Sequence, residues 1–172
     1  MTKKSIEESK EFLESEYKRR SLGMRRQILK TIHKAGSGHP GGSLSVIDIL
    51  NILYFYKLTH NPHLPSDPSR DRLIFSKGHA SPALYTVLAE AGYFPSTELE
   101  RFRKLGALLQ GHAHREVPGV EFSTGSLGQG LSAALGLALG GRLQGEKYSV
   151  FAILGDGEMQ EGSIWEALMA GG

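Results

Sequence analysis

The stretch that decides the fold is Ser149-Val150-Phe151-Ala152-Ile153-Leu154-Gly155-Asp156-Gly157. Its uninterrupted apolar run is typical of a parallel strand that is buried on both faces. The glycine that follows Leu154 ends the strand and starts a turn. We therefore predict a central strand at 149–154, with a loop over 155–162 at its carboxyl end.

Outward from this strand, the chain alternates helices with one more short strand. Leu73-Ile74-Phe75 is the second strand candidate, and the loop 76–82 leaves it. Elsewhere apolar residues recur at helical spacing. This alternation predicts an α/β domain whose mainly parallel sheet is flanked by helices. The helices that we expect are 5–34, one capped by Ser43 that runs through Tyr54, 83–91, a short one opened by the capping-box pair Thr97 and Glu100, 132–143, and one from about 161 to the C-terminus.

Three segments are expected to lack regular structure. Residues 36–42 are dominated by glycine, 61–71 contain three prolines, and 106–130 are rich in glycine, histidine and serine. A loop as long as the last one is more often functional than idle. Because ligands of parallel sheets bind at the carboxyl ends of the strands, the loops 76–82 and 155–162 are the first candidates for a site.

Composition limits the classes of function. A chain of 172 residues suits one domain, 1–172. The formal charge of +2 excludes a nucleic-acid binder held by bulk charge, and the lack of cysteine excludes disulfides and thiolate zinc sites. Residues 1–12 show no apolar core of a secretory signal, and no apolar run is long enough to span a membrane. We therefore expect a cytoplasmic protein with no nucleic-acid or membrane partner.

The turn Gly155-Asp156-Gly157 places a carboxylate between two glycines directly after a strand. Mg²⁺ keeps few protein ligands and commonly shares a carboxylate with a diphosphate, whose oxygens a glycine amide can approach closely. The tripeptide alone fits equally a plain strand-to-helix turn with aspartate as a local cap. The surrounding sequence is needed to distinguish a magnesium–diphosphate site from a plain turn.

A second glycine-rich segment, 124–130, precedes a helix and could cradle an anion, or it could be a flexible loop. Three histidines, His39, His79 and His112, each follow a glycine in a loop. Such rings can bind a phosphate or a polyhydroxy substrate, or transfer a proton near neutral pH. Any single one could equally be an exposed or satisfied ring, but their shared setting favours a functional role.

Five motifs occur in the order found in transketolases. They are Ser-Gly-His-Pro-Gly-Gly at 37–42, Ser-Lys-Gly-His-Ala at 76–80, Gly-His at 111–112, Ser-Thr-Gly-Ser-Leu-Gly-Gln-Gly at 123–130 and Gly-Asp-Gly-Glu-Met-Gln-Glu-Gly at 155–162. From about residue 20 to 172, the sequence resembles the diphosphate-binding, N-terminal domain of these thiamine-diphosphate enzymes. It is similar to the N-terminal subunit of a split transketolase, whose second chain carries the pyrimidine-binding domain.

The resemblance implies a thiamine-diphosphate-binding fold and a cofactor site. Asp156 corresponds to a ligand of Mg²⁺, for which Ca²⁺ or Mn²⁺ can substitute, and Gly157 to the residue whose amide meets the diphosphate. His79 corresponds to the histidine that contacts the diphosphate. The loop beside the diphosphate and the aminopyrimidine corresponds to Gly125, Ser126 and Leu127.

For catalysis and assembly, the resemblance implies that His39 and His112 hydrogen-bond the sugar, so that these two and His79 form the catalytic set. It implies that Glu161 and Glu166 take part in carboxylate contacts across a subunit interface. Their spacing of five alone suggests an ordinary solvated helix. The partner implied is a pyrimidine-domain chain, in a homodimer, a heterodimer or a heterotetramer.

The family's second Mg²⁺ ligand, an asparagine, is expected beyond residue 172, so we expect the domain to be truncated at its C-terminus. The reaction implied is transfer of a two-carbon ketol unit from a ketose phosphate to an aldose phosphate, with the chain inactive on its own. One alternative is a related synthase that condenses pyruvate with glyceraldehyde phosphate. Another is a non-catalytic cofactor-binding or assembly remnant. Donor and acceptor preferences are not encoded in these motifs.

Overall fold

The computed structural model describes residues 3–172, with side chains described from residue 11 onward. A parallel pair of strands, β1 (Arg72–Phe75) and β2 (Val150–Ile153), is hydrogen-bonded in the register Arg72 to Val150 through Phe75 to Ile153. Both strands of the sequence-based prediction are therefore confirmed, and so is their parallel pairing.

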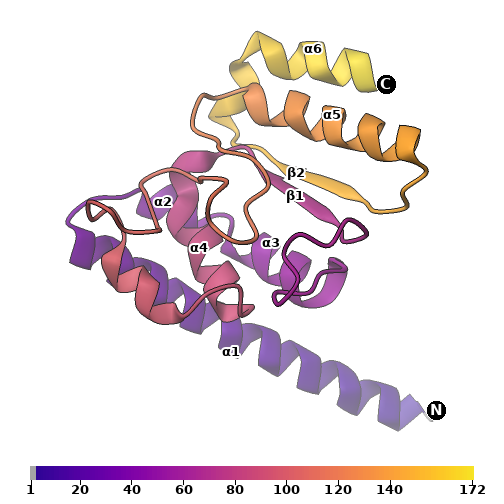
Figure 1. Cartoon of the computed structure of the whole chain (residues 1–172). Coiled ribbons are helices and arrows are strands. Elements are labelled where there is room, and N and C mark those ends of the chain that lie inside the picture. The colour runs from indigo at the N-terminus through magenta and orange to yellow at the C-terminus, as the bar shows by residue number, and fades with distance from the viewer. Residues whose placement is uncertain (1–2) are drawn as a thin grey trace.

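Helices cover both sides of this sheet (Figure 1). The sheet lies between α5 and α6 on one side and α2, α3 and α4 on the other, and the long α1 forms an outer layer beyond them. This arrangement confirms the α/β class, and none of the helices in the described part of the chain is both long and apolar enough to cross a membrane. The helices are α1 (Lys3–Ala35), α2 (Pro40–Leu44), α3 (Ile47–Ile52) with a π-helical turn at Leu53–Lys57, α4 (Ser81–Glu90), α5 (Gln129–Gln144) and α6 (Gly162–Gly171). Short 3-10 helices lie at Gly78–Ala80, Ser96–Arg101 and Gly157–Gln160.

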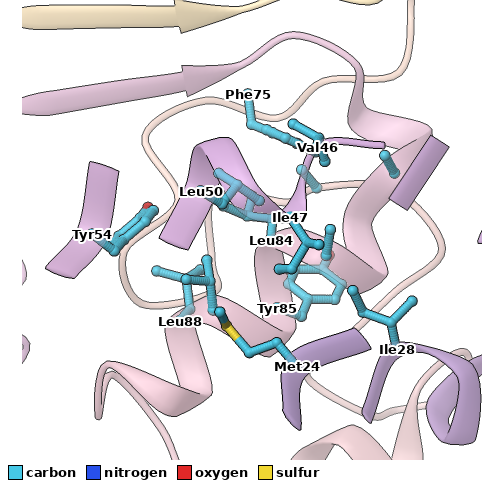
Figure 2. Close-up of a cluster of buried hydrophobic side chains, with 14 of the residues drawn as sticks. Met24, Ile28, Val46, Ile47, Leu50, Tyr54, Phe75, Leu84, Tyr85 and Leu88 are labelled. Carbon is cyan, nitrogen blue, oxygen red and sulfur yellow. The ribbon is translucent and has the colours of Figure 1, made fainter. Parts of the chain in front are cut away.

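The hydrophobic core is centred on α4 (Figure 2). This helix is buried from Ser81 to Leu88, as expected of a helix that is apolar on all sides. Tyr85 is fully buried among side chains of three other elements, and each large side chain placed there stabilises the fold by roughly 1.5–3 kcal/mol. The same core cluster includes Met24 and Ile28 of α1, Ile47 and Leu50 of α3, and Phe75 of β1.

The prediction that residues 149–154 form a central strand buried on both faces is wrong for the described part of the chain. There β2 pairs only with β1, and Val150, Phe151 and Ala152 are half-buried. Val150 and Ala152 line an open cleft of 370 Å³ between α5 and α6, whose other walls are apolar side chains and glycine. The apolar run correctly indicated strand structure. The burial of β2, however, also depends on what packs beyond the edge that does not pair with β1.

Two helix starts also differ from the prediction. Residues 36–42 do not all lack regular structure, because α2 begins at Pro40, with His39 at the N-cap. Proline fits the first helical position, since its fixed φ suits a helix and its missing N–H is not needed there. Ser43 lies inside α2 with its hydroxyl buried and unpartnered, so it is no cap. The capping box at Thr97 is likewise absent, because the helix starts after Pro95 with no side-chain cap.

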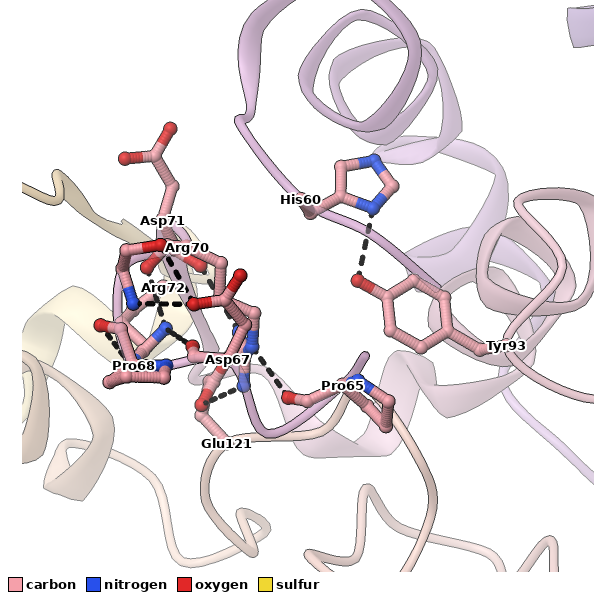
Figure 3. Close-up of polar contacts among 10 residues, drawn as sticks. His60, Pro65, Asp67, Pro68, Arg70, Asp71, Arg72, Tyr93 and Glu121 are labelled. Atoms are coloured by element: carbon pink, nitrogen blue, oxygen red, sulfur yellow. Dashed lines mark hydrogen bonds and ion pairs between the residues drawn. The ribbon is translucent and has the colours of Figure 1, made fainter. Parts of the chain in front are cut away.

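A polar cluster anchors the two long loops to each other (Figure 3). The Arg70 guanidinium donates two hydrogen bonds to the Glu121 carboxylate, and both side chains are about nine-tenths buried. Nearby, Nε2–H of His60 donates to the Tyr54 carbonyl at 2.7 Å, which leaves Nδ1 to accept from the Tyr93 hydroxyl at 3.0 Å. His60 is thus a satisfied structural histidine.

Candidate active site

The carboxyl ends of the two strands form one cleft. Because β1 and β2 are parallel and in register, Phe75 and Ile153 end side by side, and the Ser76 N–H donates to the Ile153 carbonyl at 2.9 Å. The loops that leave the strands must therefore start next to each other. Between them lies a cleft of 340 Å³, lined by Gly41, Gly42, Ser45, Lys77, His79, Leu127, Gly155, Asp156, Gly157 and Glu158.

Three histidines from separate segments lie near one another, and one of them, His79, lines this cleft. His79 lines it, half-buried, and its ring centroid lies 5.3 Å from that of the exposed His39, edge to face. His112 belongs to the long loop and is exposed. Its ring lies against Gly125, where an added Cβ would come within 3.0 Å of the His112 Cδ2. The structure thus brings His39, His79 and His112 together with the glycine-rich segment.

The environment of His79 favours its neutral ring. Burial is the main cause that lowers the pKa of His79 below its ordinary value of 6.5, and the positive potential of His39, Lys77 and His112 acts in the same direction. The Glu158 carboxylate opposes them without reversing the shift. At neutral pH the ring therefore carries one N–H donor and one acceptor nitrogen.

Asp156 also lines the cleft and is exposed, with no side-chain hydrogen bond or ion pair to residues 11–172. Gly157, the next residue, is the first of a 3-10 helix, a position whose N–H has no intrahelical acceptor. Within the described residues no group of three or more His, Asp or Glu side chains could hold a metal ion. A cation at Asp156 would therefore need oxygen ligands from a bound molecule or water, as Mg²⁺ commonly has.

The glycine-rich segment forms the third wall. Leu127 lines the cleft, Ser126 is exposed beside it, and Gly128 has φ +86° at the N-cap of α5. A side chain at Gly128 would be strained in this left-handed conformation, and its Cβ would also lie 2.3 Å from the Ser163 hydroxyl of α6. Glycine here lets the segment pass close to the loop that follows β2.

Glu161 and Glu166 do not reach the cleft. Glu161 is at the N-cap of α6, Glu166 is one turn further, and both are exposed in this single chain. This placement leaves their interface role as a prediction.

Two functional candidates, Lys77 and Glu158, were not singled out from the sequence. Lys77 is only 8% exposed, its Nζ lies 3.5 Å from the Ser45 hydroxyl, and it has no ion pair with residues 11–172. Glu158 is 2% exposed and accepts three hydrogen bonds. Both belong to motifs quoted above. The available signal was their position in the segments that leave the two strand ends, where a charged side chain can turn inward.

A model of the transketolase thiamine diphosphate binding domain matches residues 19–172. The chain belongs to the transketolase family. It is 47% identical over 150 residues to the 6-deoxy-6-sulfo-D-fructose transketolase subunit SqwG of Clostridium sp. (strain MSTE9), a match that covers 87% of this chain and 54% of that protein. It is 40% identical over 147 residues to an apulose-4-phosphate transketolase subunit of Phocaeicola vulgatus, with 86% and 52% covered.

Solved transketolases share the fold. The transketolase from Leishmania mexicana superposes with a TM-score of 0.84 at 30% identity, covering 90% of this chain and 25% of that one. The chain therefore spans about half the length of the two subunit relatives and a quarter of this solved transketolase. Family membership and the thiamine diphosphate binding domain agree with the resemblance seen in the sequence.

Proposed function

We propose that this chain is the cofactor-binding subunit of a transketolase that transfers a two-carbon ketol unit between sugar phosphates, with thiamine diphosphate and Mg²⁺. The observation that carries the proposal is the cleft at the strand ends, which Lys77, His79, Asp156 and Gly157 line together. An ammonium group and a carboxylate that line the same cleft suit a diphosphate whose charge is shared with a divalent cation.

The donors present fit the diphosphate group. Lys77 is a nearly buried ammonium group without a counter-ion in residues 11–172, and a buried charge gains most from an ionic partner. A neutral His79 and the Gly157 N–H add hydrogen-bond donors for phosphate oxygens. Asp156 would hold the cation, while Gly125, Ser126 and Leu127 would lie along the cofactor.

When bound, thiamine diphosphate supplies the thiazolium carbon that acts as nucleophile and electron sink. This chain's residues orient the reactants. His39 lies beside His79, and His112 lies beside Gly125, where their exposed rings could hydrogen-bond sugar hydroxyls. Nothing among the quoted motifs is expected to activate the aminopyrimidine, so we propose that residues 1–172 act as one diphosphate-binding domain and need a pyrimidine-domain partner.

Two relatives support the partner, since each is named as a subunit. We propose that the partner docks on the side where Glu161 and Glu166 are exposed, forming a heterodimer or heterotetramer in the cytoplasm. Cell fractionation tests the cytoplasmic location.

The test mixes the purified chain with candidate pyrimidine-domain chains, thiamine diphosphate and Mg²⁺. Ketol transfer is followed from xylulose 5-phosphate to ribose 5-phosphate, and then with 6-deoxy-6-sulfo-D-fructose and apulose 4-phosphate as donors, because the relatives' names suggest them. We expect transfer from at least one donor with both chains and none with either chain alone.

Other outcomes decide against the proposal in distinct ways. Condensation of pyruvate with glyceraldehyde phosphate would identify a synthase of the related kind. Cofactor binding without any transfer by the mixed chains would identify a non-catalytic remnant. Transfer by this chain alone would overturn the need for a partner.

A further inference from the structure

Glu158 is a buried carboxylate in the lining of the cleft. The proposed reaction gives this carboxylate no role. Its side chain is 2% exposed, and no Lys, Arg or His of residues 11–172 forms an ion pair with it. A carboxylate is costly to bury unless its oxygens are hydrogen-bonded. Its position therefore depends entirely on the donors around it.

Those donors come from three separate segments of the chain. Oε1 accepts from the Ser76 hydroxyl and from the Gly128 N–H at 3.0 Å, and Oε2 accepts from the Gly155 N–H at 2.9 Å. Ser76 follows β1, Gly128 precedes α5, and Gly155 follows β2. One side chain thus ties together the three segments that form the cleft.

Each donor is the immediate neighbour in sequence of a cleft residue. Ser76 precedes Lys77, Gly128 follows Leu127, and Gly155 precedes Asp156. The Gly128 N–H belongs to the planar peptide unit that joins Leu127 to Gly128, so its hydrogen bond also holds the Leu127 carbonyl group. The Ser76 hydroxyl and the Gly155 N–H hold the residues that directly precede Lys77 and Asp156, and so restrict where those two residues start. A carboxylate that only filled space in the core would have no reason to select these donors.

We propose that Glu158 is a positioning residue that sets the spacing of Lys77, Leu127 and Asp156, and thereby the affinity of the cleft for a diphosphate group and its cation. The proposal rests on the proposed function, because it assumes that the cleft binds the diphosphate of thiamine diphosphate. Glu158 lines the cleft, but both of its oxygens already accept hydrogen bonds from the protein, so its proposed action is through its neighbours.

The test is calorimetric titration of the 172-residue chain with thiamine diphosphate and, separately, inorganic diphosphate, each with Mg²⁺. Glu158→Gln keeps the size of the side chain but turns an NH₂ toward one of the N–H donors. We expect its dissociation constants for both ligands to rise about tenfold or more, as for loss of a charge-assisted hydrogen bond. Glu146→Gln, an exposed glutamate in the loop after α5, is the matched control and should bind as the wild type does.

A structural role would lower thermal stability without changing the affinity of the folded protein. The titrations are therefore run well below each variant's unfolding temperature, and NMR follows the Gly128 and Gly155 amide protons. We expect both resonances to move upfield in Glu158→Gln together with the loss of affinity. Wild-type affinity with shifted amides would overturn the positioning role.

Ser76→Ala keeps the test decisive if Glu158→Gln fails to fold, because it removes one donor and leaves the carboxylate. We expect Ser76→Ala to raise the dissociation constants by a smaller factor than Glu158→Gln does. The factor for the double variant should not exceed the product of the two single factors. Unchanged binding in Ser76→Ala when Glu158→Gln is unfolded would overturn the inference. If the wild type binds neither ligand, the proposed function fails and the inference fails with it. Wild-type binding that both variants retain refutes the inference alone.

Discussion

Asp156 is the exposed carboxylate of the cleft lining, whereas Glu158 is buried with both oxygens hydrogen-bonded, and the described residues hold no cluster of three acidic or histidine side chains. We expect Asp156→Asn to remove most thiamine diphosphate affinity, by about tenfold to a hundredfold, since the amide cannot share the cation's charge. Calorimetry with and without Mg²⁺ measures this, with Glu146→Gln as control. Metal-independent binding, or binding indifferent to the substitution, would show that the site lies elsewhere.

His79 should report the electrostatics of the cleft. Its pKa in the folded chain is lowered by burial first and by neighbouring positive groups second. The unfolded chain therefore takes up the proton first, so stability is fully present above pH 6.5 and falls as the pH drops from 6.5 toward the lowered value. Removing the ammonium group with Lys77→Met should raise the pKa of His79 and so narrow the pH range over which stability falls.

An NMR titration of the His79 ring tests this, alongside urea unfolding at several pH values. Lys147→Met, which removes a lysine from the exposed loop after α5, should leave the His79 titration unchanged. An unchanged pKa in Lys77→Met would mean that the ammonium group does not face the ring.

The residues of the site differ in how far the sequence could predict them. Asp156 and His79 stand in local patterns, a carboxylate between glycines and a histidine after glycine, that can be interpreted without a fold. Lys77 and Glu158 are charged types that patterns assign to solvated surfaces. Their burial arises only when the two strand ends meet, which is a long-range event that one segment does not encode.

At the scale of elements, the loop that carries His112 and Gly125 needs an anchor, because it has no regular structure between Arg101 and Gln129. The Arg70–Glu121 ion pair supplies one (Figure 3). We expect Glu121→Gln to lower the free energy of unfolding by about 1.5–3 kcal/mol, since it breaks a nearly buried, bidentate, charge-assisted pair.

Urea denaturation measures this loss. The matched control is Glu100→Gln, which breaks the exposed Lys34–Glu100 pair and should change stability little. Equal effects of the two substitutions would show that burial of the Arg70–Glu121 pair adds nothing.

Elements were predictable where their signal was local. The periodicity of α1 and the apolar runs of β1 and β2 needed no partner to be recognised. The starts of α2 and of the 3-10 helix at Ser96–Arg101 were missed, because proline backbone geometry, rather than a hydroxyl cap, begins each helix. The partial exposure of β2 was not predicted, because the burial of a strand depends on the elements that pack around it in the sheet and not on its own sequence.

At the scale of the whole molecule, the outer face of α6 combines apolar and acidic side chains. Trp165 and Met169 are 54% and 77% exposed, and Glu166, which follows Trp165, is exposed too, while Ile164 and Ala167 on the other face are buried. Exposed large apolar side chains next to carboxylates suit a surface that a partner covers. This face is where the proposed pyrimidine-domain partner would dock.

Trp165 is the single tryptophan of the chain, so it can report docking without ambiguity. With 5-fluorotryptophan incorporated into this chain alone, we expect one ¹⁹F resonance that shifts, and loses its sensitivity to exchange from H₂O to D₂O, when the partner chain is added.

Trp165→Glu should weaken co-purification with the partner, because it places a second charge beside Glu166 in a desolvated contact. Leu143→Glu, at an exposed position near the end of α5, should leave assembly unchanged. A resonance that does not move in a mixture active in ketol transfer would place the partner on another face and separate Glu161 and Glu166 from the interface.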